Sequence, residues 1–330
     1  MTIERIMWKI KHPKSILQSL LFYTARLYSD RLYLKWMFWL RVGYKPDLDS
    51  PRTFNEKLQW LKLYNRKPEY TQMVDKVEAK KYVANLIGEE YLIPTLGVYN
   101  SVEEIDFDKL PNQFVLKCTH DSGGIIICRD KSRLNTHKAK KNLTKWLKNN
   151  YYYQNREYPY KNVKPRIIAE QYMVDVSYSM DIHEPTNKTC DVAYLQNKHG
   201  LLDYKFMCFD GVVKALFLDI GVIGNSEGHS DEYYRSIFDR DFNVMPFKET
   251  RDHYPIPINR PHFFEEMVKI AEILSQGFPH IRVDLYYING QIKVGELTFF
   301  HGSGLSNHFI PEEWNYKFGE WIKLPEQKIE

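Results

Sequence analysis

The first seventy residues repeat their apolar side chains at helical spacing. Leucines, tyrosines and tryptophans recur three and four residues apart between Leu32 and Leu40, as they do on one face of a helix. Prolines and aspartates over residues 46–51 then interrupt the pattern. Thr53 and Glu56 follow with the spacing of a capping box, in which each side chain bonds the other residue's backbone N–H. We therefore expect helices from residue 2 to about residue 70, with a new one beginning after Thr53.

Farther along the chain the pattern changes to strands. Short apolar runs flank a glycine-containing loop, and Asp210-Gly211 and Asn289-Gly290 are typical hairpin turns. Antiparallel hairpins that are separated from helices predict an α+β fold. The expected elements are helices 75–86, 138–150 and 263–274, strands 91–94, 114–118, 125–128 and 167–173, and hairpins 204–218 and 281–300.

Composition limits the classes of protein. The chain has 330 residues, of which 43% are hydrophobic and 27% charged, enough for one large domain or two to three small lobes. A net charge of +4 is too small to indicate a nucleic-acid partner. Four cysteines without C-x-x-C spacing indicate free thiols in a reducing cytoplasm. The sequence also lacks an apolar run of transmembrane length and a signal-peptide cleavage pattern.

The segment from Arg5 to Arg41 is basic and rich in aromatic residues, among them Trp8, Trp36 and Trp39. Such a segment can lie on the anionic inner face of a membrane. Its more common use is a helix that packs its apolar stripe on the protein body. We favour packing on the body and keep peripheral membrane contact as the alternative.

The last predicted hairpin carries Asp284 on one strand and Glu296 on the other, and their relation depends on the turn. With a strict two-residue turn Ile288 pairs with Gln291, and Glu296 points to the face opposite Asp284. With a three-residue loop Ile288 pairs with Ile292, and Asp284 lies directly opposite Glu296.

In the second register the carboxylates of Asp284 and Glu296 repel each other unless a cation lies between them. Cβ atoms of facing residues on adjacent strands are only about 5 Å apart, and hard oxygen ligands suit Mg²⁺ on nucleotide phosphates. The competing interpretation is two unrelated surface acids on a common type of hairpin.

A second group of candidates surrounds the glycine-containing loop. Lys117 points away from the apolar face of its strand, and Ser122, Gly123 and Gly124 follow in the loop. Glycines let backbone N–H groups approach anionic oxygens, and a lysine adds a point charge. The loop therefore fits a phosphate-binding lid, although it is not a Walker motif. An ordinary turn beside a solvated lysine is the alternative.

Further candidates carry weaker signals. Lys76 precedes a predicted helix and would by itself be a surface lysine. Glu170, Gln171 and Tyr172 end a predicted strand, where they could contact an adenine and a ribose, or form an ordinary strand edge.

Two cations, Lys205 and Arg282, could face phosphates. The histidines have no zinc-ligand spacing with the cysteines, and the absence of a G-x-S-x-G elbow argues against a serine hydrolase.

Taken in order, these signals resemble the TupA-like ATP-grasp family, which is named for teichuronopeptide biosynthesis. The resemblance runs from about residue 35 to the end of the chain and consists of short motifs. They are Gly43-Tyr44-Lys45-Pro46-Asp47-Leu48, Thr53-Phe54-Asn55-Glu56-Lys57-Leu58-Gln59-Trp60, Asp75-Lys76, Phe114-Val115-Leu116-Lys117, Asp203-Tyr204-Lys205-Phe206, Arg282-Val283-Asp284 and Gly295-Glu296-Leu297-Thr298.

The resemblance implies an ATP-grasp fold that uses ATP and Mg²⁺. Lys76 and Lys117 would contact the phosphates, residues 170–172 would form the adenine hinge, and Asp284 and Glu296 would hold Mg²⁺. Many ATP-grasp enzymes carry an asparagine two residues after the metal-binding glutamate, where this chain has Thr298. The expected organisation is a helical region 1–72, a lobe 73–170 with the glycine loop and a lobe 171–330 with the metal site.

The implied activity is a cytoplasmic carboxylate–amine ligase of bacterial surface polysaccharide biosynthesis. It would join an amino acid or amine to a sugar carboxylate or to another amino acid. Arg282 and Lys205 would stabilise charge in the transition state. The alternatives are an ATP-grasp kinase acting on a glycan hydroxyl, a glycosyltransferase and a non-catalytic binding module. Asp239-Arg240-Asp241 is formally the D-x-D motif of glycosyltransferases, but it lies in a polar loop.

Overall fold

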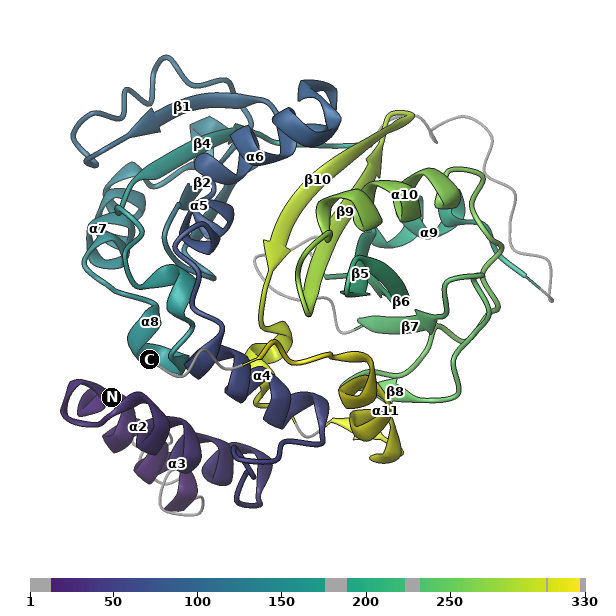
Figure 1. The fold of residues 1–330 in the computed structure, drawn as a ribbon. Coiled ribbons are helices and arrows are strands. Elements are labelled where there is room, and N and C mark those ends of the chain that lie inside the picture. Colours follow the sequence, from purple (N-terminus) through teal and green to yellow (C-terminus); the bar gives the residue numbers. More distant parts are fainter. Residues whose placement is uncertain (1–12, 176–188, 223–231, 307, 327–330) are drawn as a thin grey trace.

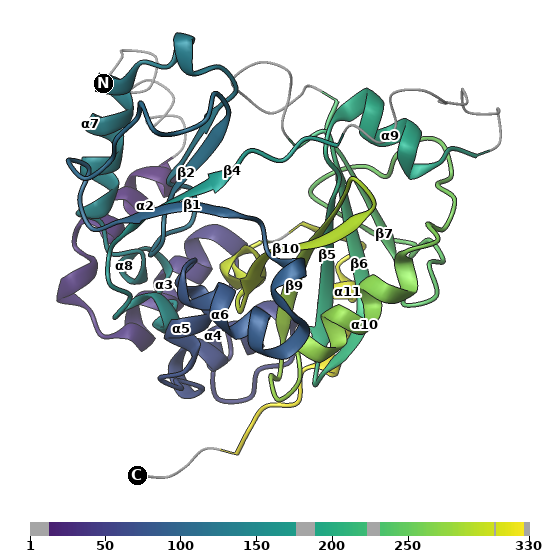
Figure 2. The same cartoon turned by 90° about the horizontal axis from the view of Figure 1, so that it is seen from above.

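The computed structural model describes residues 13–175, 189–222, 232–306 and 308–326. Two β-sheets lie on either side of a pair of helices, and a layer of N-terminal helices lies beneath them (Figure 1). Figure 2 shows the same arrangement from above. Arg5 and Trp8 of the basic N-terminal segment lie outside the described residues.

The N-terminal layer confirms the helices expected in its described part. Thr53 accepts a hydrogen bond from the backbone of Glu56, and Glu56 accepts one from the backbone of Thr53, so the predicted capping box is present. The two central helices of the molecule follow this layer. The five helices are α2 (Pro13–Tyr23), α3 (Asp30–Val42), α4 (Phe54–Tyr64), α5 (Tyr70–Val74) and α6 (Glu78–Ile87).

The first sheet is antiparallel, with its four strands in the order β1-β4-β2-β3. One face packs on helix α7 through Phe114, Leu116 and Leu143. Because side chains alternate along a strand, Lys117 and Glu170 share the other face. The elements of this region are β1 (Thr95–Tyr99), β2 (Phe114–Cys118), β3 (Ile125–Cys128), α7 (Thr136–Leu147), α8 (Tyr152–Asn155) and β4 (Ile167–Gln171).

The second sheet is also antiparallel and has five strands in the order β10-β9-β5-β6-β7. Its apolar face packs on α10, where Phe264 stacks on Phe206 with ring centroids 6.0 Å apart. Its opposite face carries charged side chains, including Lys205 and Asp284. The elements are β5 (Asp203–Phe209), β6 (Val212–Ile220), β7 (Tyr234–Phe238), α10 (Phe264–Leu274), β9 (Ile281–Ile288) and β10 (Gln291–Thr298).

The prediction of a strand at residues 91–94 is wrong. Residues Glu89–Tyr91 form a 3₁₀ turn, and β1 begins only at Thr95. Pro94 has no N–H to give to a ladder, and Leu92 instead forms an isolated bridge to Val294 of the second sheet. The sequence pattern also did not predict several short elements, namely α8, β7, α9 (Val192–His199), β8 (Lys248–Glu249), β11 (Phe309–Ile310) and α11 (Glu313–Trp321).

Helix α11 packs closely against the start of α4, and Gly319 makes this contact possible. A Cβ atom built on Gly319 would overlap the carbonyl oxygen of Arg52 and lie 2.8 Å from the carbonyl carbon of Thr53. These obstacles are backbone atoms, which cannot rotate away as a side chain can.

We predict that Gly319→Ala destabilises the protein. In an ordinary helix interior this change stabilises by about 0.5–1 kcal/mol. Here overpacking against the backbone of Arg52 and Thr53 reverses the sign and costs about 1–3 kcal/mol. Urea denaturation measures the difference, with Lys317→Ala on the exposed side of the same helix as the control. A Gly319→Ala variant that is as stable as the wild type or more stable would contradict the close approach.

Candidate active site

The β9–β10 hairpin combines features of the two registers that the sequence left open. Asn289 and Gly290 both have positive φ, 51° and 78°, and Ile288 pairs with Gln291, so the turn has two residues. The register then shifts at a β-bulge between Val294 and Glu296, and Glu296 becomes the partner of Asp284. The two carboxylates are therefore opposite each other because of the bulge, not because of a three-residue loop.

Gly295 is the extra residue of this bulge, and its missing side chain leaves room for Tyr286. A Cβ atom on Gly295 would lie 2.5 Å from Cε2 of the Tyr286 ring. Bulges re-aim side chains next to functional sites. The glycine thus permits both the register shift and the packing of Tyr286 beside the carboxylates.

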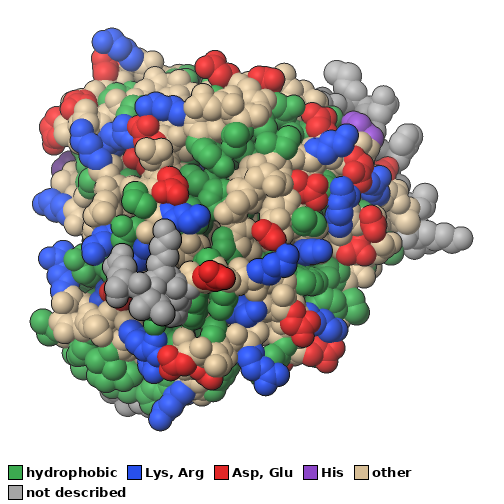
Figure 3. Space-filling view, in the orientation of Figure 1, with side chains coloured by type: hydrophobic (Ala, Val, Ile, Leu, Met, Phe, Trp, Pro, Cys, Tyr) green, Lys and Arg blue, Asp and Glu red, His purple; other side chains and the backbone are tan. Residues whose placement is uncertain are grey.

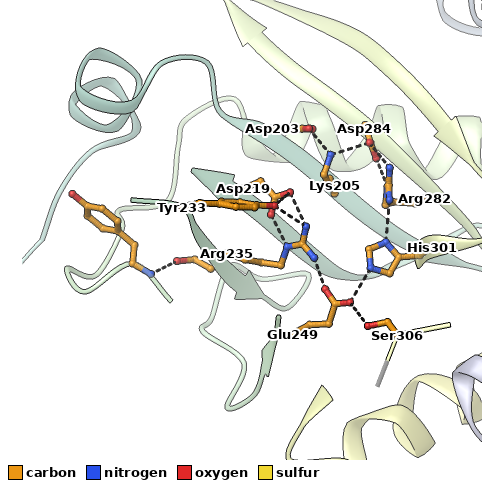
Figure 4. A network of polar contacts seen from close by, with 12 residues as sticks. Asp203, Lys205, Asp219, Tyr233, Arg235, Glu249, Arg282, Asp284, His301 and Ser306 are labelled. Carbon is orange, nitrogen blue, oxygen red and sulfur yellow. Dashed lines mark hydrogen bonds and ion pairs between the residues drawn. The ribbon is translucent and has the colours of Figure 1, made fainter. Parts of the chain in front are cut away.

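Arg282 lies beside both carboxylates and offsets their repulsion. Its Nε and Nη2 atoms donate to Asp284 at 2.6 and 2.7 Å, and Nη2 lies 3.6 Å from Glu296 Oε2 (Figure 4 shows the Asp284 pair). Lys205 Nζ also donates to Asp284, at 3.0 Å. Burial raises the pKa of Asp284, but the charges of Arg282 and Lys205 outweigh it and lower the pKa to about 2. Asp284 is accordingly a carboxylate at neutral pH.

The charged network continues from Arg282 across the sheet. Arg282 Nη1 donates at 3.0 Å to Nδ1 of His301, whose Nε2 lies 3.5 Å from Oε1 of Glu249 (Figure 4). Glu249 also accepts from Arg235, which binds Asp219 through two nitrogens at 2.5 and 2.7 Å. Burial lowers the pKa of His301, which favours the neutral ring that this arrangement needs. The network holds the guanidinium of Arg282 from the side away from the carboxylates.

Sequence reasoning did not find Glu249 and Arg235. A usable signal was present for Arg235, because it is a charged residue inside the apolar strand β7, as Lys117 is inside β2. Glu249 lies in a strand of only two residues, which leaves no periodicity to detect.

A second charged group lies on the first sheet, around Glu170. This buried carboxylate is 2.6 Å from Lys80 Nζ and 2.7 Å from Lys117 Nζ. Burial raises the pKa of Glu170, but the two lysines outweigh it and lower the pKa. Lys80 was not predicted, although its position four residues after Lys76 would have indicated it.

A pocket between the two sheets joins the charged group around Glu170 to Glu296, whereas Arg282, Lys205 and Asp284 are not in its lining. Its polar lining comes from Lys76, Lys80, Lys117 and Glu170 on one side and from Glu296 on the other. Met73, Val83, Leu92 and Leu297 contribute apolar walls. A cleft with apolar walls and a few convergent charged groups is typical of a small-molecule site.

The glycine loop lies beside Lys76. The Nζ atom of Lys76 donates to the backbone carbonyl of Asp121, so this lysine is held at the loop. Ser122 and Gly123 are exposed, and Gly124 is buried close to the carboxylate of Asp121. Of the predicted hinge residues, Gln171 and Tyr172 are at the end of β4 and outside the pocket lining, unlike Glu170.

Of the two predicted metal ligands, Glu296 lines the pocket, whereas both oxygens of the buried Asp284 accept from Arg282 and Lys205. Within the described residues there is no group of three or more His, Cys, Asp or Glu side chains that could hold a metal. Mg²⁺ on a nucleotide needs only one or two carboxylates, because phosphates and waters complete its shell. The side chain of Glu296 is 37% exposed at the pocket. Thr298 Oγ1 accepts from Arg282 at 3.1 Å and is engaged there.

Comparison with solved structures finds proteins of low identity. D-cycloserine synthetase DcsG has 15% identity and a TM-score of 0.39, covering 76% of this chain and 69% of its own. D-Alanine-D-alanine ligase from Helicobacter pylori has 12% identity and a TM-score of 0.39, and the match covers 82% of this chain and 69% of the ligase. The ATP-grasp ligase PsnB, complexed with minimal precursor, Mg and ADP, has 12% identity and a TM-score of 0.34. This match covers 81% of this chain and 66% of PsnB. No curated protein matches the chain.

The family assignment rests on the sequence. The model of the family described as TupA-like ATPgrasp matches residues 56–183 and 191–323, well over half of the chain. The match spans both charged groups and the pocket between them. The chain therefore belongs to the TupA-like ATP-grasp family.

Proposed function

We propose that the protein is a carboxylate–amine ligase of bacterial surface polysaccharide biosynthesis. It would join an amino acid or another amine to a sugar carboxylate or to a second amino acid. The observation that supports the reaction type best is the pocket in which the lysines around Glu170 face Glu296. The polysaccharide context comes from the resemblance to the TupA-like family, and the reducing cytoplasm, where ATP is available, is the proposed location.

The nucleotide would lie between the two sheets. Lys76 and Lys117 would contact its phosphates, with the backbone of Ser122, Gly123 and Gly124 closing over them. Glu170 would contact the adenine amine or the ribose, and the backbone of Gln171 and Tyr172 would border the adenine. Lys80 would then hold the carboxylate of Glu170 in place while Lys117 turns to a phosphate.

Asp284 and Glu296 would hold Mg²⁺, which neutralises charge on the phosphates. Arg282 and Lys205 are fixed by Asp284 before any substrate binds. Fixed charges stabilise a transition state without reorganising at the moment of reaction. These two cations would therefore offset the charge that grows on the transferred phosphoryl group.

The proposed reaction then has two steps, phosphoryl transfer and amide formation. A carboxylate oxygen of the acid attacks the γ-phosphorus of ATP, and ADP leaves with the electrons of the broken P–O bond. The amine attacks the carbonyl carbon of the resulting acylphosphate, inorganic phosphate leaves, and the amine loses a proton to give an amide. The task of the protein is placement and charge neutralisation.

We predict that ADP release requires an acid and an amine together. The purified protein would be supplied with Mg-ATP and a panel of uronic acids and amino acids, with ADP followed by a coupled assay and the product by mass spectrometry. The expected product is an amide. A stable phosphorylated product that forms without any amine would instead indicate a kinase, and no stimulation by any acid and amine pair would remove support for the ligase.

We predict that Glu296→Gln lowers kcat by about 10²–10³ and raises the Mg²⁺ concentration needed for half-maximal activity. The amide keeps the shape of the side chain but removes the anionic ligand. Glu313→Gln on the exposed surface of α11 serves as the control. An unchanged Mg²⁺ requirement with full activity would exclude Glu296 from the metal site and favour a non-catalytic role for it.

We predict that Glu170→Gln destabilises the protein in a pH-dependent way. The folded pKa of Glu170 lies below its unfolded value of about 4.3. Its ion pairs therefore stabilise the fold above that value, and this contribution is lost as the pH falls through the lowered folded pKa. We expect a loss of about 1–3 kcal/mol at pH 7 that shrinks towards zero near the folded pKa.

Urea denaturation of the wild type and of Glu170→Gln at several pH values measures this difference. Glu313→Gln is again the control, because its carboxylate is exposed. A difference that stays constant from pH 7 down to acid would show that charge at Glu170 is not the cause.

A further inference from the structure

The N-terminal helices bury one apolar face and expose another. Tyr33, Met37 and Phe38 of α3 pack with Leu21 of α2 and with Leu305, in a cluster of their own. The expectation that these helices pack on the body is therefore confirmed for this face. A helix that is satisfied by such packing normally shows polar residues on its opposite side.

The opposite side of both helices is apolar instead. On α2 the exposed residues Ile16, Leu20 and Tyr23 follow each other by four and three positions. On α3 the spacing from Leu32 through Trp36 to Trp39 is the same, and the two tryptophans are 44% and 40% exposed.

The helices α2 and α3 pack side by side, with the Lys14 and Gln18 side of α2 facing α3. Lys14 Nζ of α2 lies 5.9 Å from the centre of the Trp39 ring on α3, and Gln18 of α2 donates to the carbonyl of Leu40 at 3.2 Å. Figure 3 shows hydrophobic side chains gathered at the lower left, over α2 and α3, with Lys and Arg beside them. Residues 13–42 supply nine of the twenty large hydrophobic residues that are exposed within the described part of the chain.

The positive charge of the chain is concentrated in the same part of the sequence. Residues 1–45 contain nine Lys and Arg and two Asp and Glu, a net charge of +7. The whole chain carries +4, so the remaining residues together carry −3. Exposed tryptophan and tyrosine beside lysine and arginine match the interface of an anionic bilayer, where aromatic rings lie at the level of the headgroups.

We propose that α2 and α3 dock the protein on the anionic, cytoplasmic surface of a cell membrane. The contact would be peripheral: among the residues that the structure describes, no helix is long and apolar enough to cross a bilayer. The exposed apolar residues of both helices would enter the headgroup region, and residues such as Lys14 and Lys35 would contact lipid phosphates. This inference does not depend on the proposed ligase activity.

Vesicle co-sedimentation of the full chain tests the proposal. We expect binding to vesicles of phosphatidylglycerol and phosphatidylcholine, none to phosphatidylcholine alone, and weaker binding at about 0.5 M salt because of screening. The double variant Trp36→Ala with Trp39→Ala should bind roughly tenfold more weakly or worse, as should Lys14→Gln with Lys35→Gln.

Matched changes elsewhere on the surface serve as controls. Val244→Ala with Ile273→Ala removes exposed apolar side chains far along the chain, and Lys109→Gln with Lys317→Gln removes two exposed charges. Both should bind as the wild type does, and circular dichroism confirms that every variant is folded. Failure of the wild type to bind anionic vesicles, or equal losses in the controls, would overturn the proposal. So would light scattering showing a dimer that the Trp36 and Trp39 changes dissociate, because a second copy would then cover this surface.

Discussion

The ion pair between Arg282 and Asp284 is the interaction on which the charged face of the second sheet depends. Asp284 is buried, and without its partner its charge would cost about 3–5 kcal/mol. Arg282 also reaches Glu296 and His301, so one guanidinium connects the two carboxylates to the network that ends at Arg235. Fixing this side chain therefore fixes the surroundings of both carboxylates. Removing it would disturb both the fold and the site.

The charges of the two groups support the proposed role of a divalent cation. The group on the first sheet, with Lys80, Lys117 and Glu170, carries a net charge of +1. The group with Arg282, Lys205, Asp284 and Glu296 is neutral. A nucleoside triphosphate would bring several negative charges into a pocket that is only weakly positive. Its affinity for such a pocket requires added positive charge, and the exposed carboxylate of Glu296 is where a cation can bind without losing a strong ion pair.

Local signals predicted the fold better than they predicted the site. The capping box of Thr53 and Glu56 and the turn at Asn289-Gly290 depend on neighbours in sequence, and both are present. The register of Glu296 could not be read in this way, because the bulge at Gly295 depends on where the Tyr286 ring packs. The spacing of Lys80 from Lys76 indicated it, but its pairing with Glu170, ninety residues away, could not be predicted from neighbours in sequence. The family resemblance supplied part of what local signals could not, because it implied Asp284 and Glu296 as a pair although the register of their strands was not known.

The same helices can pack on the body and face a membrane, because they have two apolar faces. Polar contacts join their packed face to the side of the molecule that carries the pocket. Arg156, buried beside Asp30 at 2.8 Å, holds α3 to α8, and the neighbouring Asn155 donates at 2.9 Å to Ser303 in the turn that follows β10. Helices that were bound to a membrane would therefore carry the pocket with them in one orientation. An acceptor anchored in the same membrane would reach Glu296 from a constant direction, which a flexible tether would not provide.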